Sequence, residues 1–144
     1  MKIMILHLSD IHLKGSEHAI LKRVEKLKNS IQYLESELEC CFIVVSGDTV
    51  FSGCREEYEI AANFFSELKG TLSASSISPE VKHIFIPGNH DCNLKERNTQ
   101  LRSSIINQIA FKQAELADGT IIDCCTSVQQ DFFEFISSFE ATRF

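Results

Sequence analysis

Three short apolar runs, separated by longer amphipathic stretches, constrain the fold of this chain more than any other feature. The runs cover residues 2–8, 41–45 and 81–86, and small or polar residues follow each of them directly. Runs of this length between turn residues predict buried strands. Apolar side chains recur at three- and four-residue steps in residues 17–39 and again in residues 55–68, which predicts an amphipathic helix in each stretch. The first 90 residues therefore predict the order strand, helix, strand, helix, strand.

This order predicts an α/β fold with a parallel sheet. Each connection between the predicted strands is long enough for the crossover that parallel strands require. Such crossovers are almost always right-handed, so we expect the carboxyl ends of all three strands at one edge of a single sheet. We expect Gly70 to end the second helix and the serine-rich residues 71–79 to form a loop.

The pattern is weaker after Asn93. Residues 95–116 predict a helix, residues 117–119 a turn, residues 120–124 a short strand and residues 129–139 a final helix. The last stretch is rich in phenylalanine and needs an apolar partner surface, which the sequence pattern does not provide.

Composition excludes several classes of protein. A length of 144 residues suits one domain. The net charge of −6, from 14 basic and 20 acidic residues, argues against non-specific coating of nucleic acid. No apolar run approaches the roughly 18 residues of a membrane span, so we expect no membrane partner. The six cysteines show no C-x-x-C spacing, and no secretory signal precedes them, which predicts a reduced, cytoplasmic protein.

Polar motifs follow the three predicted strands at the point where each strand ends. They read D-I-H at residues 10–12, G-D at residues 47–48 and G-N-H-D at residues 88–91. Ligands of open α/β sheets bind outside the carboxyl ends of the strands. We therefore expect one pocket that contains Asp10, His12, Asp48, Asn89 and His90. Their mixed oxygen and nitrogen ligands suit Mn, Fe or Zn better than Ca or Mg.

The spacing within these motifs has physical reasons. Asp10 and His12 are two residues apart at a strand end, so their side chains can point to the same side. Gly47 lets the backbone turn sharply, so that the next side chain projects into the cleft. Asp91 follows His90, and we expect its carboxylate to orient the imidazole ring or to fix its protonation state.

The ordered motifs resemble those of the calcineurin-like metallophosphoesterases, a superfamily that includes phosphatases, cyclic-nucleotide phosphodiesterases and nucleases. The local sequences LSDIH, VSGD and IPGNHD carry the resemblance, which covers about residues 1–92. It implies the amino-terminal β-α-β-α-β half of an αββα sandwich, followed by mainly helical segments. Residues 1–144 would then form a partial domain, in which residues 93–144 are a helical insertion or cap.

The resemblance also implies a reaction and a role for each residue. The reaction is hydrolysis of a phosphate ester by water that two divalent metal ions activate (Mn, Fe or Zn). The implied metal ligands are Asp10 and His12 for one ion, Asp48 as a bridge between both and Asn89 for the second ion. The implied catalytic residues are His90, which contacts the phosphate or protonates the leaving oxygen, and Asp91, which supports it. The substrate class, whether a small molecule, a phosphoprotein or a nucleic acid, stays open.

The sequence departs from the family pattern in its histidines. The family has a further histidine and a G-H-x-H element after G-N-H-D, whereas none of the five histidines here lies after residue 90. Three interpretations follow. The main one is that the chain is the amino-terminal part of a longer phosphoesterase. It could otherwise be a catalytically inactive metal- or partner-binding module, or another chain could supply the missing imidazoles.

The remaining histidines favour structural roles. His7 lies inside the first predicted strand, and we expect it in the core or at the sheet edge. His18 and His83 begin a predicted helix and strand, and we expect both at the surface.

Overall fold

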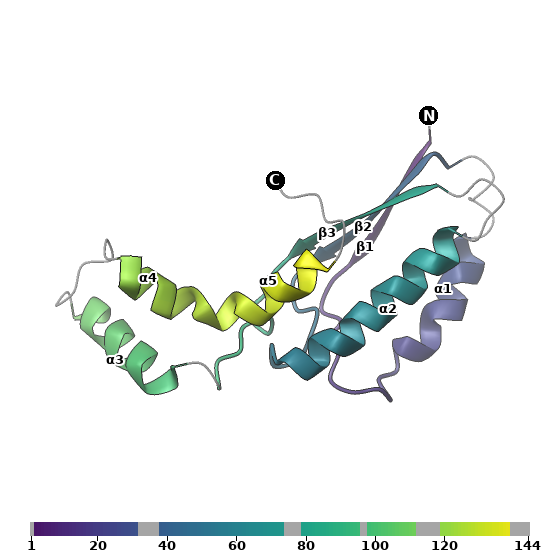
Figure 1. Cartoon of the computed structure of the whole chain (residues 1–144). Coiled ribbons are helices and arrows are strands. Elements are labelled where there is room, and N and C mark those ends of the chain that lie inside the picture. Colours follow the sequence, from purple (N-terminus) through teal and green to yellow (C-terminus); the bar gives the residue numbers. More distant parts are fainter. Residues whose placement is uncertain (1, 32–37, 74–78, 96–97, 112–118, 139–144) are drawn as a thin grey trace.

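Three parallel strands form the centre of the fold. The computed structural model describes residues 2–31, 38–73, 79–95, 98–111 and 119–138. In these residues, one sheet has the order β1 (Ile3–Leu8), β2 (Cys40–Ser46), β3 (Glu80–Ile86), and both neighbouring pairs are parallel (Figure 1). The predicted α/β class with a parallel sheet is confirmed.

The three strands end at the same level of the sheet. Leu8 of β1 lies opposite Val45 of β2, and Ser46 of β2 lies opposite Ile86 of β3. The carboxyl ends of the strands therefore meet at one edge of the sheet, as the sequence predicts (Figure 1). All three polar motifs begin at this edge.

The helices between the strands differ in length from the prediction. A short 3-10 helix, η1 (Leu21–Arg23), leads into α1 (Val24–Ile31), and turns replace the first residues of the predicted helix. The end of that predicted helix, residues 32–37, lies outside the described residues.

Helix α2 (Arg55–Ser73) continues past Gly70, so the prediction that Gly70 ends it is wrong. A glycine inside a helix costs about 1 kcal/mol relative to alanine. Leu68 and Leu72, on either side of it, are buried in the core. Burial of such a side chain contributes about 2 kcal/mol, which outweighs the cost of the glycine.

The carboxyl-terminal part is helical. Its elements are α3 (Thr99–Ala110), α4 (Gly119–Thr126), the 3-10 helix η3 (Ser127–Gln129) and α5 (Gln130–Ser137). The predicted strand at residues 120–124 is wrong, because these residues belong to α4. A short apolar run fits a helix as well as a strand, and here it continues into η3 and α5. Residues 71–73 belong to α2 and Gly119 begins α4, so the predicted loop and turn are wrong at these positions. Residues 74–78 of the loop and residues 117–118 of the turn lie outside the described residues.

The core lies on one face of the sheet. Alternate residues of β2, among them Cys41, Ile43 and Val45, are fully buried there against α2. Two phenylalanines of α5, Phe132 and Phe135, belong to the same core. This core is the apolar partner surface that the phenylalanine-rich stretch requires.

The opposite face of the sheet is open in the described part of the chain. Ile3 and Ile5 of β1 are 48% and 68% exposed, and Ile86 of β3 is 52% exposed. Parallel sheets usually have both faces covered. The described helices cover only one.

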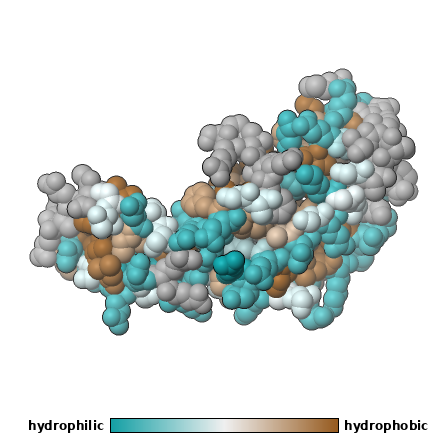
Figure 2. Space-filling model, in the orientation of Figure 1, coloured by the Kyte–Doolittle hydropathy of each residue, from teal (hydrophilic) through white to brown (hydrophobic). Residues whose placement is uncertain are grey.

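Helices α3 and α4 extend beyond the edge of the sheet that carries the polar motifs (Figure 1). Apolar surface gathers over them (Figure 2), where Leu101, Ile106 and Phe111 are at least half exposed. Among the described helices, none is long and apolar enough to cross a membrane.

Candidate metal centre

The loop after β1 runs alongside the loop after β2. The backbone N–H of Asp10 donates to the carbonyl of Gly47 (3.3 Å), and that of His12 donates to the carbonyl of Asp48 (2.9 Å). A parallel bridge continues this pairing beyond the sheet. The main chain therefore holds the first polar motif directly beside the second.

Three residues of the motifs have left-handed backbone conformations. The φ angles are 53° at Asp10, 51° at His12 and 52° at Asp48. Asp and His adopt this region more readily than most residues, but it still costs of order 1–3 kcal/mol at each position, and such residues gather at functional sites. Gly47, just before Asp48, has a φ of 95°, which agrees with the expected sharp turn.

The side chains of His12, Asp48 and His90 come together at the edge of the sheet. One ligand atom from each lies within 4.8 Å of the others, and all three residues are half-buried. The two imidazole rings meet edge to face, with their centroids 4.5 Å apart. Two imidazoles and a carboxylate are ligands that Mn, Fe and Zn accept.

The surroundings of His90 fix which ring nitrogen carries its hydrogen. Its Nδ1 lies 2.6 Å from the backbone carbonyl of Phe51. A carbonyl oxygen only accepts hydrogen bonds, so Nδ1 donates and, in the neutral ring, Nε2 has the free lone pair. A histidine that donates one nitrogen to a carbonyl and presents the other is the usual arrangement beside a metal.

His12 provides a second sign that the site fits a cation. Its Nδ1 is buried and has no hydrogen-bond partner among the described residues. A buried polar atom without a partner costs free energy, and each such atom calls for an explanation. A divalent cation bound through this nitrogen would give it a partner.

Asp48 is held tightly by the loop after β3. Its Oδ1 accepts the backbone N–H of His90 at 2.9 Å. A Cβ at Gly88 would lie 2.5 Å from the backbone nitrogen of Asp48 and would overlap its carboxylate. Position 88 therefore requires glycine, because the second and third motifs approach each other more closely than any side chain allows.

Asp10 and Asn89 lie on the same edge but outside the group of three. Asp10 is exposed, and its carboxylate accepts a hydrogen bond from the hydroxyl of Ser9. Asn89 is exposed between Gly88 and His90. Their roles as metal ligands stay predictions.

Asp91 does not contact the ring of His90, contrary to the expectation that it orients that ring. The carbonyl of Phe51 has that place. The carboxylate of Asp91 is fully buried and accepts hydrogen bonds from backbone N–H groups and from the hydroxyl of Tyr58. The reason is geometric: the chain turns after His90, so that the next side chain points into the core.

Other residues flagged by the sequence have varied surroundings. His7 lies on the edge strand β1, where its Nε2 is 2.6 Å from the hydroxyl of Ser46. His83 is 1% exposed, so the expectation that it lies at the surface is wrong. Burial raises the pKa of the Cys92 thiol, and the charge of Asp91 raises it further, so this thiol is neutral.

Sequence reasoning missed two residues of the site. The ring centroids of Phe51 and His90 are 5.5 Å apart. The ammonium of Lys14 lies over the ring of Phe51, 4.4 Å from its centroid. Its exposure of 42%, three residues after Asp48, is unusual for phenylalanine. Tyr58 lies in the amphipathic pattern of residues 55–68, and nothing in the spacing marks its contact with Asp91.

Comparison with known proteins bears on this arrangement of motifs. The family model for calcineurin-like phosphoesterases matches residues 3–137. This chain belongs to the calcineurin-like phosphoesterase family. The match includes all three motifs and the helices after them, whereas the sequence resemblance reached only about residue 92.

Two relatives are similar to the chain. An uncharacterized metallophosphoesterase-like protein of Bacillus subtilis (strain 168), YydB, is 23% identical over 145 residues, which cover 100% of this chain and 29% of that protein. An uncharacterized protein of Acanthamoeba polyphaga mimivirus is 34% identical over 118 residues, which cover 78% of this chain and 8% of that protein. The chain thus spans less than a third of either relative.

Members of this family typically bind divalent metals. The group of His12, Asp48 and His90 is the candidate for such a metal site in this chain.

Proposed function

We propose that this chain provides the metal-binding half of a phosphoesterase, which hydrolyses phosphate esters with two divalent metal ions. The observation that carries the proposal is the convergence of His12, Asp48 and His90, from three loops, at one edge of the sheet. In the proposal the ions are Mn, Fe or Zn, and their ligands from this chain are Asp10, His12, Asp48 and Asn89. When bound, such ions lower the pKa of water for attack on phosphorus and stabilise charge on the phosphoryl oxygens.

His90 belongs to the same group as His12 and Asp48, but in the proposal it acts on the phosphate and is not one of the metal ligands. Because its Nδ1 donates to the carbonyl of Phe51, Nε2 is the nitrogen that takes up and releases a proton. Its place in the group of three supports a role toward a phosphate bound at the metals. We propose that His90 contacts that phosphate or protonates the leaving oxygen.

We propose further that the complete enzyme is a longer polypeptide. Four protein ligands for two metals leave most coordination positions to water, and such sites bind weakly. The apolar sheet face with Ile3, Ile5 and Ile86 is open in the described part of the chain. Both relatives are several times longer. In that enzyme, residues 93–144 would be an insertion or cap beside the site.

A second candidate function is a binding module that holds metal or a partner without catalysis. The position of all five histidines at or before residue 90 favours it, because no further imidazole completes the metal shells. A partner chain that supplies the imidazoles is the third possibility.

Hydrolysis assays on the purified chain test these proposals. The substrates are a phosphomonoester, a phosphodiester, a cyclic nucleotide, a phosphopeptide and single-stranded DNA, each with Mn²⁺ or Zn²⁺. Cleavage that Asp48→Asn abolishes would support the enzyme, and the preferred substrate would define its class. Robust metal-dependent cleavage by the chain alone would rule out the binding module. Near-normal cleavage by Asp48→Asn and His90→Ala would refute the proposed mechanism.

A further inference from the structure

The carboxylate of Asp91 is one of the most completely enclosed polar groups in the described chain, with 0% of the residue exposed. Its Oδ2 accepts the backbone N–H groups of Gly88 (2.9 Å) and Thr49 (3.2 Å). Its Oδ1 accepts the backbone N–H of Val50 (3.2 Å) and lies 3.2 Å from the hydroxyl of Tyr58. Four donors therefore converge on one carboxylate.

None of these donors is a cationic side chain, and no described residue forms an ion pair with Asp91. A buried carboxylate without a cation is costly unless hydrogen bonds satisfy it. Hydrogen bonds to an ionised acceptor are about twice as strong as neutral ones. The position of the two loops that supply the N–H groups is thus tied to this one side chain.

Those loops are the two that carry the candidate metal centre. Thr49 and Val50 directly follow Asp48, and Gly88 comes two residues before His90. Asp91 therefore holds the second and third motifs together from the core side. The bond from the His90 N–H to the Asp48 carboxylate, 2.9 Å long, joins them on the other side.

Tyr58 connects this carboxylate to the helices. Its hydroxyl lies 3.0 Å from the backbone carbonyl of Asp91 and 3.2 Å from the carboxylate, so it donates to this residue. Burial raises the pKa of Tyr58, and the charge of Asp91 raises it further, so the hydroxyl keeps its proton. Tyr58 itself is 3% exposed.

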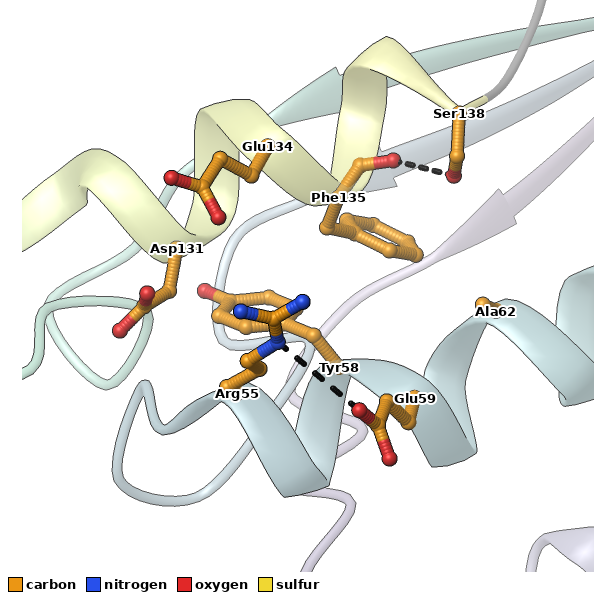
Figure 3. Close-up of a pocket in the computed structure, with 8 residues that line it drawn as sticks. All are labelled: Arg55, Tyr58, Glu59, Ala62, Asp131, Glu134, Phe135 and Ser138. Carbon is orange, nitrogen blue, oxygen red and sulfur yellow. Dashed lines mark hydrogen bonds and ion pairs between the residues drawn. The ribbon is translucent and has the colours of Figure 1, made fainter.

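The ring of Tyr58 packs against α5. It stacks on Phe135 with the centroids 5.2 Å apart and an interplanar angle of 25°, and it meets Phe132 edge to face at 6.3 Å. Figure 3 shows the rings of Tyr58 and Phe135 between α2 and α5, where both residues line a cavity of about 230 Å³. The chain after the motifs thus packs against the residue that holds Asp91.

We propose that Asp91 and Tyr58 are positioning residues that set the distance between Asp48 and His90, with α5 holding Tyr58 in place. Neither residue touches metal or substrate in this proposal. The effect on metal binding rests on the proposed function, whereas the effect on the two loops does not.

Two variants test the proposal in the full 144-residue chain. Asp91→Asn keeps the size of the side chain but places an amide NH₂ where an oxygen accepts N–H groups. Tyr58→Phe removes only the hydroxyl and keeps the ring on Phe135. The control is Leu72→Val, at the far end of α2, where the side chain is 1% exposed and remote from the loops. This substitution lowers stability through the core and leaves the hydrogen bonds of Asp91 in place.

The readouts are amide hydrogen exchange of residues 47–53 and 87–93 and the affinity for Mn²⁺. We expect exchange in both segments to become faster in Asp91→Asn and Tyr58→Phe, while the strands stay protected. We expect Mn²⁺ to bind about tenfold or more weakly to Asp91→Asn, and several-fold more weakly to Tyr58→Phe, in the range that supporting residues of metal sites show. Leu72→Val should change neither the exchange of the two loop segments nor the affinity for Mn²⁺, when each variant is measured at the same interval below its own melting temperature.

Unchanged exchange in both loop segments of the two variants would overturn the proposal. So would a loss of Mn²⁺ affinity that Leu72→Val shows equally at the same melting temperature, because the effect would then be general destabilisation. If the unmodified chain binds no Mn²⁺, the proposed function fails. Amide hydrogen exchange of the two loop segments then decides alone whether Asp91 and Tyr58 position the loops. Should Asp91→Asn fail to fold, Tyr58→Phe carries the same comparison.

Discussion

Backbone strain in this chain is concentrated where the metal chemistry is expected. Asp10, His12 and Asp48 all have φ angles near 50°, in a region where a Cβ costs roughly 1–2 kcal/mol. The pairing of the two loops holds these residues in that conformation. The left-handed backbone of these residues lowers the stability of the fold and places their side chains at the edge of the sheet.

Asp10 allows a direct measurement of this strain. We expect Asp10→Gly to be more stable than Asp10→Ala by about 1 kcal/mol, because only glycine adopts a positive φ without penalty. Both variants lose the same carboxylate, so the difference reports the backbone alone. Urea unfolding of the pair measures it. Equal stability of the two variants would show that residue 10 is not held in the left-handed region in solution.

His83 is a second residue with an effect that the sequence does not reveal. It is enclosed between aromatic rings, stacked on Phe85 at 5.7 Å and edge to face with Phe65 at 6.2 Å. Burial, together with the nearby charge of Lys69, lowers its pKa to about 4. Between pH 6.5 and pH 4 the unfolded chain therefore binds a proton at His83 that the folded chain does not.

Stability should fall as the pH falls through this range. From pH 7.5 to pH 5 the lowered pKa of His83 removes about 2 kcal/mol from the free energy of unfolding. His83→Leu should lose that part of the dependence while other titrating groups stay as they are. Unfolding titrations at both pH values measure the difference. The same loss in His83→Leu and in the unmodified chain would contradict the burial of His83.

At the scale of elements, α5 is the helix that joins the carboxyl-terminal part to the core. Phe132 is 1% exposed and Phe133, its neighbour, is 52% exposed. The helix therefore has one buried face and one open face, as its amphipathic pattern requires. Asn93 adds a polar tie, because its backbone N–H donates to Val128 (2.8 Å) and its side-chain amide donates to Asp131 (3.1 Å).

Neighbouring phenylalanines provide a matched test of this docking. Phe132→Leu should lower the free energy of unfolding by about 1 kcal/mol, since it loses aromatic contacts in a packed site. Phe133→Leu should change it by less than about 0.5 kcal/mol. Chemical denaturation of both variants decides. Equal effects would mean that α5 does not pack on the sheet with this face.

The sequence predicts strands better than it predicts the carboxyl-terminal helices, for physical reasons. Each strand is a short apolar run ended by Ser-Asp, Ser-Gly or Pro-Gly, and such a boundary leaves little choice of structure. The run at residues 120–124 has no such boundary, so α4 could not be told from a strand. Gly70 shows the same limit of the sequence pattern. The burial of Leu68 and Leu72 keeps α2 helical past this glycine.

At the scale of the whole molecule, the convergence of His12, Asp48 and His90 follows from the strand order, so it could be predicted. The partners of Asp91 could not. They are backbone N–H groups about 40 residues away, and they depend on how two loops turn after the sheet ends. Tyr58 and Phe51 are hidden for the same reason: their roles arise from contacts, whereas their spacing is that of ordinary core and turn residues.

The whole fold has one face of its sheet covered and one face open in the described residues. The candidate metal centre lies at an edge between them. Main-chain hydrogen bonds join the loops after β1 and β2, and the Asp48 carboxylate accepts the backbone N–H of His90 from the loop after β3. A site built in this way needs no further element to bring His12, Asp48 and His90 together. We therefore propose that this chain itself binds a divalent metal.

Calorimetric titration of the purified chain with Mn²⁺ tests that claim most directly. We predict that the unmodified chain binds Mn²⁺, that Asp48→Asn abolishes binding, and that Glu59→Gln, on the exposed surface of α2, binds as the unmodified chain does. Circular dichroism shows whether the variants are folded. Absence of binding in the unmodified chain, or equal binding in Asp48→Asn, would show that the chain has no metal site at Asp48.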